Sequence, residues 1–363
     1  AYAMKKMAEA MGAKIFCMNS RKSGIKQVIG HDASPNTIDE LLSTDVILAV
    51  GFNATDNPVI QLKMKQASER GTKVILVNPE KYPQKMNYLY DEIYTANDLT
   101  FIKEFAKAII DSGKAKNAEG YEAFAESLES VKVGEAAKAV ADVYMNAKKA
   151  MIVFTQNLIT SDAAALLADI AVISGHIGSP KNNSQGLIDM GITSGAEELN
   201  GVKALLVFGE EADIDIDALE FLAVCDTHVT SLAAKADVVI PGTGFASTDG
   251  TYTNTERRMQ LVLAAIDENV ALSNWEVAAE IAHVLEVDYE WEDTEDISME
   301  MNDTVPAYKY AEVGKVLGGV LTPSENAGLV VVEDGKFADP IKCTDSLMNV
   351  IMERLPKPAD PTA

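Results

Sequence analysis

The sequence predicts an α/β fold made of two doubly wound, Rossmann-like domains whose parallel sheets face a central cleft. Runs of consecutive apolar residues, such as 45–50 and 73–77, indicate strands that are buried on both faces, as in parallel sheets. Helical segments separate these runs, and a polar loop follows each one. The pattern begins again near residue 150. We therefore expect a first domain at 1–147, a second at 148–290 and a C-terminal extension at 291–363.

The composition is that of an ordinary globular chain. It has 363 residues, of which 47% are hydrophobic and 24% charged, enough for two or three domains. The net charge of -24 argues against nucleic acid or an anionic membrane surface as a partner. No run has the length of a transmembrane helix, and no secretory signal is visible. The three cysteines are far apart, which predicts reduced thiols in a cytoplasmic protein rather than a disulfide framework.

The first half of the chain alternates helices and strands. A complete βαβ unit, right-handed by default, is expected between residues 45 and 77. The expected elements are a helix at 2–12, a helix at 37–42 capped by Asn36, a strand at 45–50, a helix at 58–70, and strands at 73–77 and 88–94, followed by helices at 99–112 and 134–147.

The second half repeats this alternation. Strand 150–154 is expected to begin the second domain, and the acidic run 286–295 is expected to be solvated surface. The other expected elements are a helix at 161–174, a loop rich in Gly, Asn and Ser at 175–191, strands at 203–208, 221–225 and 237–240, a helix at 275–285, a strand and turn at 329–335, and a final helix at 344–354.

Polar loops follow five of the apolar strands, and in doubly wound folds ligands bind outside the carboxyl ends of the strands. No loop carries G-x-G-x-x-G or a P-loop, which argues against simple NAD or ATP binding.

The loop at 241–260 is the most informative. Its hydroxyl groups, glycines and adjacent Arg257 and Arg258 suit a phosphorylated or polyoxygenated ligand. A glycine-rich surface loop with two solvated arginines fits the same composition.

The residues Asp-Val-Val-Ile-Pro at 237–241 and Asp-Gly-Thr-Tyr-Thr-Asn-Thr-Glu-Arg-Arg-Met-Gln at 249–260 resemble the molybdopterin oxidoreductase family, especially its formate dehydrogenase branch. Further segments resemble that family in the same order, and the resemblance covers about residues 30 to 310. These segments are 45–53, 77–79, 183–191, Trp275 and 305–308.

The resemblance implies two related domains that hold a bis(molybdopterin guanine dinucleotide) cofactor between them. In such sites Asn and Asp recognise guanine edges, Arg and backbone amides hold pyrophosphate, and glycines permit close approach. One nucleotide half-site is then assigned to Gly51, Asn53, Asn78 and Asp98. The other half-site or the pterin is assigned to Gln156, Asn183, Gln185, Gly186, Asp189, Gly209, Glu210, Thr251, Asn254, Arg257 and Gln260.

The chain also departs from the family pattern. Catalytic formate dehydrogenases carry a metal-binding Cys or selenocysteine followed by His. One alignment places Cys17 at this position, with Met18 in place of His, and another matches Arg21 to a family Arg and places Ser23 there. Met18 cannot relay a proton near neutral pH. Ser247 replaces a common acidic residue, and Glu80 replaces a common Arg. The family's iron–sulfur domain is expected to precede residue 1.

These departures resemble the large iron–sulfur subunit of bacterial complex I, in which related domains commonly lack the metal centre. Three hypotheses follow. The first is a degenerate, metal-free domain of a redox subunit in an NADH- or ferredoxin-linked complex, where molybdopterin guanine dinucleotide is either bound or vestigial. The second is an active molybdenum or tungsten enzyme with Cys17 as the metal ligand. The third is an α/β binding module without a redox role.

Overall fold

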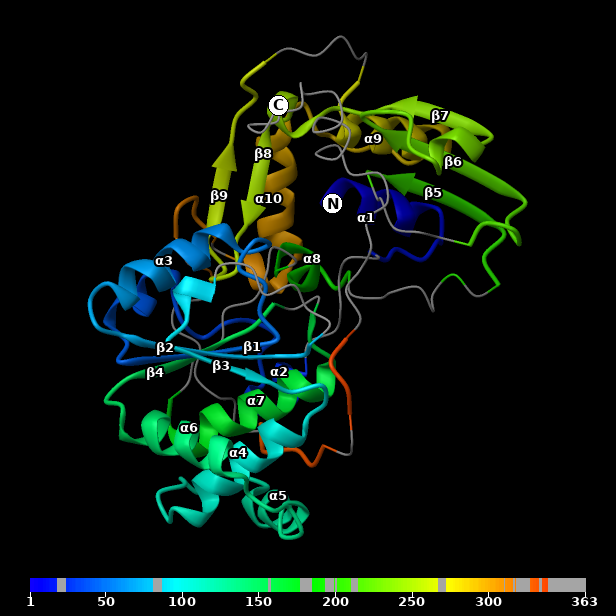
Figure 1. Ribbon diagram of the computed structural model, residues 1–363. Coiled ribbons are helices and arrows are strands. Elements are labelled where there is room, and N and C mark those ends of the chain that lie inside the picture. Colours follow the sequence, from blue (N-terminus) through cyan, green and yellow to red (C-terminus); the bar gives the residue numbers. More distant parts are fainter. Residues whose placement is uncertain are drawn as a thin grey trace, which may run out of the picture.

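The computed structural model describes residues 1–17, 24–80, 87–155, 158–176, 185–192, 199, 201–209, 215–266, 272–309, 311–315, 317, 327–332 and 335–338. Within these residues the chain forms a four-stranded sheet, a three-stranded sheet and a two-stranded hairpin (Figure 1). The predicted α/β class with parallel sheets is confirmed. None of the described helices combines the length and the apolar composition needed to cross a membrane.

The first sheet has the order β3-β2-β1-β4, and every neighbouring pair is parallel. All five residues of β1 are buried, as expected of a central strand covered on both faces. Val46 pairs with Lys73 on one side and with Ala150 on the other, so that the carboxyl ends of the strands lie along one edge. The strands are β1 (Val46–Val50), β2 (Lys73–Asn78), β3 (Glu92–Thr95) and β4 (Ala150–Val153).

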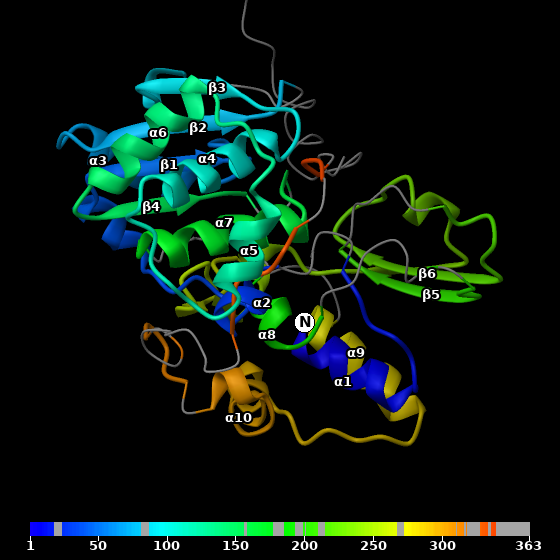
Figure 2. The same ribbon diagram turned by 90° about the horizontal axis from the view of Figure 1, so that it is seen from below.

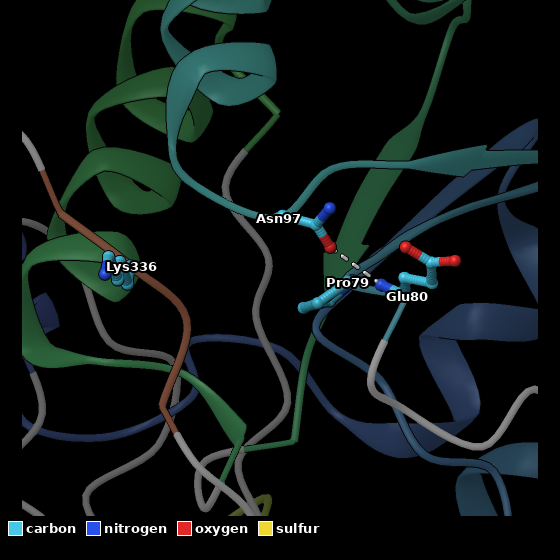
Figure 3. Close-up of a pocket in the computed structure, with 4 residues that line it drawn as sticks. All are labelled: Pro79, Glu80, Asn97 and Lys336. Carbon is cyan, nitrogen blue, oxygen red and sulfur yellow. Dashed lines mark hydrogen bonds between the residues drawn. The ribbon is translucent and has the colours of Figure 1, made fainter.

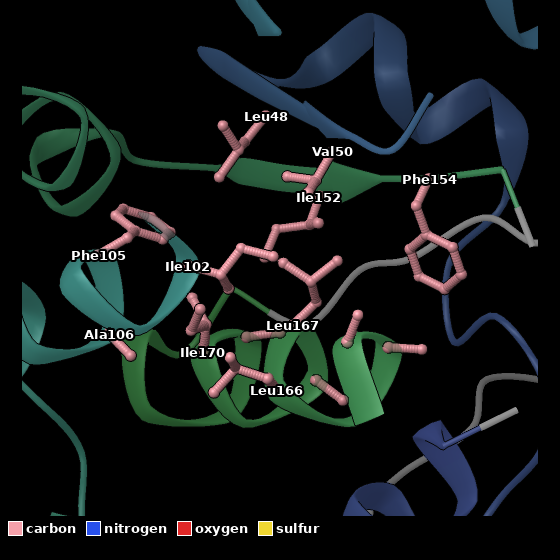
Figure 4. Close-up of a cluster of buried hydrophobic side chains, with 14 of the residues drawn as sticks. Leu48, Val50, Ile102, Phe105, Ala106, Ile152, Phe154, Leu166, Leu167 and Ile170 are labelled. Atoms are coloured by element: carbon pink, nitrogen blue, oxygen red, sulfur yellow. The ribbon is translucent and has the colours of Figure 1, made fainter. Parts of the chain in front are cut away.

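Helices cover both faces of this sheet. In Figures 1 and 2, α4 (Thr100–Asp111), α6 (Glu135–Asn146) and α7 (Ser161–Ser174) lie on one face. The opposite face carries α3 (Pro58–Ser68) and the 3₁₀ helix η1 (Ile38–Ser43). Alternate residues of β1 point to opposite faces, which gives two apolar clusters. Figure 4 shows the larger one, where Leu48, Val50 and Ile152 meet side chains of α4 and α7.

Glycine at position 24 allows helix α2 (Ile25–Ile29) to pack directly against α7. A Cβ atom on Gly24 would lie 1.8 Å from the carbonyl oxygen of Ser161, which is far inside contact distance. Any larger residue would therefore push the two helices apart.

The second sheet has the order β5-β6-β7, again parallel. Its strands are β5 (Ala204–Phe208), β6 (Phe221–Asp226) and β7 (Val238–Pro241). Leu206 and Phe208 face helices α1 (Tyr2–Ala10) and α9 (Asn274–Val284). Val207 and Val224 face the other way, towards the connecting segments and η5 (Ala233–Lys235). Three of the four residues of β7 are exposed, so this sheet is covered less completely than the first.

An antiparallel hairpin of β8 (Gly250–Thr253) and β9 (Met259–Val262) follows β7. It packs with α10 (Thr294–Thr304) around a small cluster that includes Met259, Met301 and Tyr308. Neither the hairpin nor α10 was predicted. The remaining described elements are α5 (Tyr121–Ser127), α8 (Gln185–Asp189), η2 (Asn87–Leu89), η6 (Phe245–Ser247) and η7 (Pro306–Tyr308).

Some expectations were wrong. Strand 150–154 does not begin a second sheet, because β4 pairs with β1, so a boundary between residues 147 and 148 divides the first sheet. An apolar run looks the same whichever parallel sheet it joins. Thr37, not Asn36, caps η1, through a capping box with Glu40. Residues 329–332 form no strand.

Two further expectations remain open. The helix predicted at 344–354 lies outside the described residues. The cleft between the two sheets stays a prediction.

Candidate functional site

Asn78 ends strand β2 at the carboxyl edge of the first sheet. Its Oδ1 accepts a hydrogen bond from the backbone N–H of Phe52 (2.9 Å), and its Nδ2 donates to the carbonyl of Phe52 (2.8 Å). The side chain is only 1% exposed. The oxygen and the nitrogen of the Asn78 side chain are therefore both used to hold the loop after β1 against β2. Asn78 thus supports the backbone of the predicted half-site.

Asn53 also forms bonds within its own loop. Its Oδ1 accepts from the backbone N–H and the hydroxyl of Thr55 (3.1 and 2.7 Å), which is an Asx turn. The backbone N–H of Asn53 donates to Thr155 Oγ1 (3.0 Å), and Asn57 Nδ2 donates to the same oxygen (2.7 Å). Buried Thr155, which sequence reasoning missed, thus joins the loops that follow β1 and β4.

A pocket of about 460 Å³ lies at this edge of the sheet (Figure 3). It is lined by Pro79 and Glu80 after β2, by Asn97 after β3, and by Lys336 from the C-terminal region. Asn97 Oδ1 accepts the backbone N–H of Glu80 (2.9 Å). The predicted residues Asn78 and Asp98 are each the immediate neighbour of a lining residue. Lys336 gave no sequence signal, because it is more than 200 residues from the other lining residues.

Asp98 flanks this pocket and lies just before α4. Its Oδ1 accepts the backbone N–H of Thr100 (2.9 Å), and hydrogen bonds from Thr100 lower the pKa of Asp98 below its usual value. The carboxylate is therefore ionised at neutral pH, and it satisfies an N–H group at the helix start. The backbones of Asp98 and Lys336 form an isolated antiparallel bridge.

A second cluster forms where α8 meets the turn of the hairpin. Arg257 has a left-handed φ of 62° and is 8% exposed. Burial lowers the pKa of Arg257, and the nearby Asp189 and Tyr308 oppose that effect. Within the described part of the chain, Arg257 Nη1 makes no hydrogen bond. A buried guanidinium with an open donor requires a partner such as a ligand or ordered water.

Gln185, at the start of α8, supplies an acceptor to the same cluster. It is fully buried, and its Nε2 donates to the carbonyl of Asp32 (3.0 Å) and to Asp189 Oδ1 (2.8 Å). Among the described residues its Oε1 has no hydrogen-bond partner. The structure therefore brings together the predicted residues Gln185, Asp189 and Arg257. Gln185 and Arg257 each carry a buried polar atom that has no hydrogen-bond partner among the described residues.

Gly186 places α8 next to this hairpin, with room for a Cβ atom in ordinary contact. A Cβ atom on Gly186 would lie 3.4 Å from the hydroxyl of Tyr308 and 3.5 Å from Thr253 Cβ. Tyr308 is almost fully buried and shares a hydrogen bond with Thr253 Oγ1 (2.5 Å). Burial raises the pKa of Tyr308 to about 12, so the hydroxyl keeps its proton. Thr253 and Tyr308 were not among the predicted site residues.

The hairpin turn uses Asn254 structurally. Asn254 Oδ1 accepts from the backbone N–H groups of Glu256 (3.1 Å) and Arg258 (2.8 Å). The buried carboxylate of Glu256 accepts from Arg258 Nε and from the backbone N–H of Ile38 (both 2.6 Å). The two arginines therefore differ: Arg258 is paired with Glu256, whereas Arg257 lies in the cluster with Asp189.

The remaining predicted residues are dispersed. Thr251 pairs with Leu261 and Gln260 with Tyr252, so Thr251 and Gln260 point to opposite faces of the hairpin and cannot both line one site. Gly209, with a φ of 57°, is an exposed residue after β5. Gln156, Asn183 and Glu210 lie outside the described residues, as do Met18, Arg21 and Ser23.

Cys17 is partly buried. Across the part of the chain that the structure describes, no group of three or more His, Cys, Asp and Glu side chains is arranged to hold a metal ion. The choice between Cys17 and Ser23 as the residue at the metal position stays a prediction, because the residues between them are not described.

A family model described as molybdopterin oxidoreductase matches residues 1–284, which is more than half of the chain. The chain belongs to the molybdopterin oxidoreductase family. The predicted family is thus confirmed. The residues that line the pocket and those of the cluster around Arg257 lie within the matched region, except for Lys336 and Tyr308.

The chain is similar to several formate dehydrogenase subunits. It is 27% identical to the F420-dependent formate dehydrogenase subunit alpha of Methanocaldococcus jannaschii, over 79% of this chain and 54% of that protein. It is 23% identical to formate dehydrogenase H of Escherichia coli, over 81% of this chain and 52% of that protein. The chain thus spans about half the length of these relatives.

The fold is also similar to a chain in a crystal structure of the formyltransferase/hydrolase complex (FhcABCD) from Methylorubrum extorquens, solved with methylofuran. The TM-score is 0.55 at 16% identity, over 78% of this chain and 88% of that chain. At this identity the similarity supports the fold alone.

Proposed function

We propose that this chain is part of a redox subunit of a molybdopterin-family oxidoreductase, in which it holds the organic part of a molybdopterin guanine dinucleotide without a catalytic metal. It acts as a scaffold domain in an NADH- or ferredoxin-linked electron-transfer complex. The observation that carries the proposal is the buried Arg257 with an open donor, beside Gln185 with an open acceptor.

These two groups suit a pterin or its phosphate. Leaving a buried polar group unsatisfied costs about 1–3 kcal/mol, and more for a charged group, so a retained buried guanidinium is best explained by a ligand that pairs with it. Arg257 Nη1 would donate to a ligand oxygen, and Gln185 Oε1 would accept a ligand N–H. Such a cofactor, when it carries its metal, supplies two-electron redox chemistry.

The pocket at the first sheet suits the guanine end of the same ligand. A guanine edge offers N–H donors that the Glu80 carboxylate can accept, and an O6 acceptor for the ammonium of Lys336 or the amide of Asn97. Glu80 stands where the family commonly has Arg. The pocket is therefore better suited to a base than to a phosphate.

The similarity to formate dehydrogenases favours a second candidate, an active molybdenum or tungsten enzyme with Cys17 as the metal ligand. The two candidates make opposite predictions. In the scaffold proposal, Cys17→Ala leaves the activity of the assembled complex unchanged. In the alternative, the same variant remains folded but loses activity and metal.

Analysis of the purified complex for molybdenum, tungsten and acid-released GMP tests the proposal. We expect GMP without stoichiometric metal. We also expect Arg257→Gln to lower the GMP content, while the matched variant Arg258→Gln, which alters a partly exposed arginine paired with Glu256, retains it. One metal ion per chain would overturn the metal-free assignment. Absence of GMP from the wild-type protein would overturn the proposal that the protein retains the nucleotide ligand.

A further inference from the structure

The turn between β8 and β9 is buried, although most connecting segments lie at the surface. This buried turn comprises residues 254–258, and its three central residues are each at most 8% exposed. The Glu256 carboxylate accepts the backbone N–H of Ile38 at the start of η1 (2.6 Å), and the carbonyl of Arg257 accepts that of Leu317 (2.8 Å). A polar turn in such a place needs partners for its polar groups.

Arg257 holds a backbone conformation that residues other than glycine seldom adopt. Its φ of 62° lies in the left-handed region. Its N–H donates to the carbonyl of Asn254 (2.9 Å), and its own carbonyl accepts from Leu317, so contacts on both sides fix this conformation. Backbone strain of this kind persists where the surrounding structure over-determines it, and it clusters at ligand sites. The buried turn thus keeps the guanidinium inside the protein at a conformational cost.

Thr255 adds a third open polar atom to those of Arg257 and Gln185. Its Oγ1 is buried and has no hydrogen-bond partner among the described residues. A buried hydroxyl without a partner destabilises a fold, whereas valine has nearly the same shape and no hydroxyl. The buried hydroxyl of Thr72, by contrast, donates to the carbonyl of Thr44 (2.6 Å). The hydroxyl of Thr255 is therefore better explained by a bound ligand than by contacts within the fold.

The charges at the buried turn are already balanced. Arg258 Nε lies 2.6 Å from Glu256 Oε1. Burial lowers the pKa of Arg257, and the nearby carboxylate of Asp189 opposes that effect. A phosphate group here would add negative charge beside Asp189 and Glu256 in a buried site, which is unfavourable unless further cations pair with it. A neutral part of a ligand adds no charge.

The open atoms match one edge of a pterin ring, which presents a carbonyl oxygen beside ring and amino N–H groups. Arg257 Nη1 can donate to the carbonyl, Gln185 Oε1 can accept an N–H, and the Thr255 hydroxyl can do either. The orientation of the Gln185 amide is well determined, because its Nε2 donates to two acceptors, the carbonyl of Asp32 and Asp189 Oδ1. Its oxygen is therefore the atom left for the ligand.

We propose that the buried turn binds the neutral edge of the pterin ring rather than a phosphate group, and that Thr255 contacts the ring together with Arg257 and Gln185. This inference rests on the proposed function, and it decides which part of the ligand lies at this site. The phosphate groups of the ligand then lie away from Asp189 and Glu256.

Calorimetric titration of the full protein, stripped of bound ligand, tests this with neopterin, a pterin without phosphate, and with inorganic pyrophosphate. We expect wild type to bind neopterin more tightly than pyrophosphate. Thr255→Val is expected to weaken neopterin binding about tenfold, the loss of one buried hydrogen bond. The ligand-free variant is expected to be at least as stable as wild type in thermal unfolding, because it lacks the unpaired hydroxyl.

Thr72→Val is the matched control, because it makes the same chemical change at a buried hydroxyl that has a partner. We expect it to unfold at a lower temperature than wild type, since the carbonyl of Thr44 loses its donor. Its affinity for neopterin is expected to stay that of wild type.

Tighter binding of pyrophosphate than of neopterin overturns the assignment of the ring to the buried turn. Equal neopterin affinity of wild type and Thr255→Val, or a loss of stability in Thr255→Val like that in Thr72→Val, overturns the role of Thr255. Failure of both probes to bind wild type overturns the whole inference. In each case the GMP content of the purified complex decides separately whether the proposed function stands.

Discussion

Asp169 is a carboxyl group buried in the larger apolar cluster beside the first sheet. It lies on α7, is fully buried, and its Oδ1 accepts the backbone N–H of Val330. Burial raises the pKa of Asp169 to about 8, and the hydrogen bond from Val330 opposes that effect. The carboxyl is therefore largely protonated at neutral pH, and it ties Val330 of the C-terminal region to α7.

Asp169 is expected to make stability fall as the pH rises. Its folded pKa of about 8 exceeds the ordinary value of 3.8, so between these values the folded state binds more protons than the unfolded state. The free energy of unfolding should then decrease with rising pH by up to about 1.4 kcal/mol per pH unit.

Asp169→Asn should remove this slope and be more stable than wild type at the upper end of the window. Urea unfolding across the window measures it, with exposed Asp162→Asn as control. Parallel profiles for wild type and Asp169→Asn would contradict the expectation.

Asn78 is expected to matter for stability rather than for ligand recognition. Asn78→Ala would leave the N–H and C=O of Phe52 buried without partners, at a cost of about 2–4 kcal/mol. Asn53→Ala removes a bond pattern in a more open loop and should cost less. Chemical denaturation measures both. A variant Asn78→Ala that keeps its stability but loses GMP would assign the ligand role to this side chain instead.

At the scale of elements, the hairpin β8–β9 shows what the sequence could and could not predict. The central strands were predictable because each is a continuous apolar run. The hairpin strands are four residues each with mixed polarity, and they are held by contacts with α8, α10 and η1 that are remote in the sequence. Arg257 and Gln185 were found through the family resemblance. The burial that distinguishes Arg257 from Arg258 appears only once the chain is folded.

Glu256 is expected to anchor this hairpin to η1, which packs on the first sheet. Its buried carboxylate accepts the N–H of Ile38 at the start of η1, and hydrogen bonds to charged acceptors are about twice as strong as neutral ones. Glu256→Gln should therefore destabilise the protein by about 1–2 kcal/mol and speed exchange of the Ile38 N–H. Glu312→Gln, an exposed carboxylate near the same turn, is the control. Unchanged exchange at Ile38 in Glu256→Gln would show that the hairpin is held elsewhere.

At the scale of the whole molecule, both sheets are parallel, but they differ in how completely other elements cover them. Every residue of β1 is buried, and β2 is buried from Val74 onward. In the second sheet only Val207 of β5 is buried, and no residue of β7 is. The sequence did not reveal this difference, because the strands of both sheets are similarly apolar. Exposure depends on which helices lie over them.

This difference predicts that the two sheets open with different free energies. Local opening is easiest where few apolar contacts cover the backbone, so amides of β1 and β2 should exchange slowest and those of β5 and β7 fastest, with the buried central strand β6 between them. Hydrogen exchange with mass spectrometry measures this for each strand. The internal control is β4, an edge strand of the first sheet whose four residues are all buried, which separates the effect of cover from that of lying at an edge. Protection of β7 equal to that of β1 would show that the second sheet is covered by residues beyond those that contact it here.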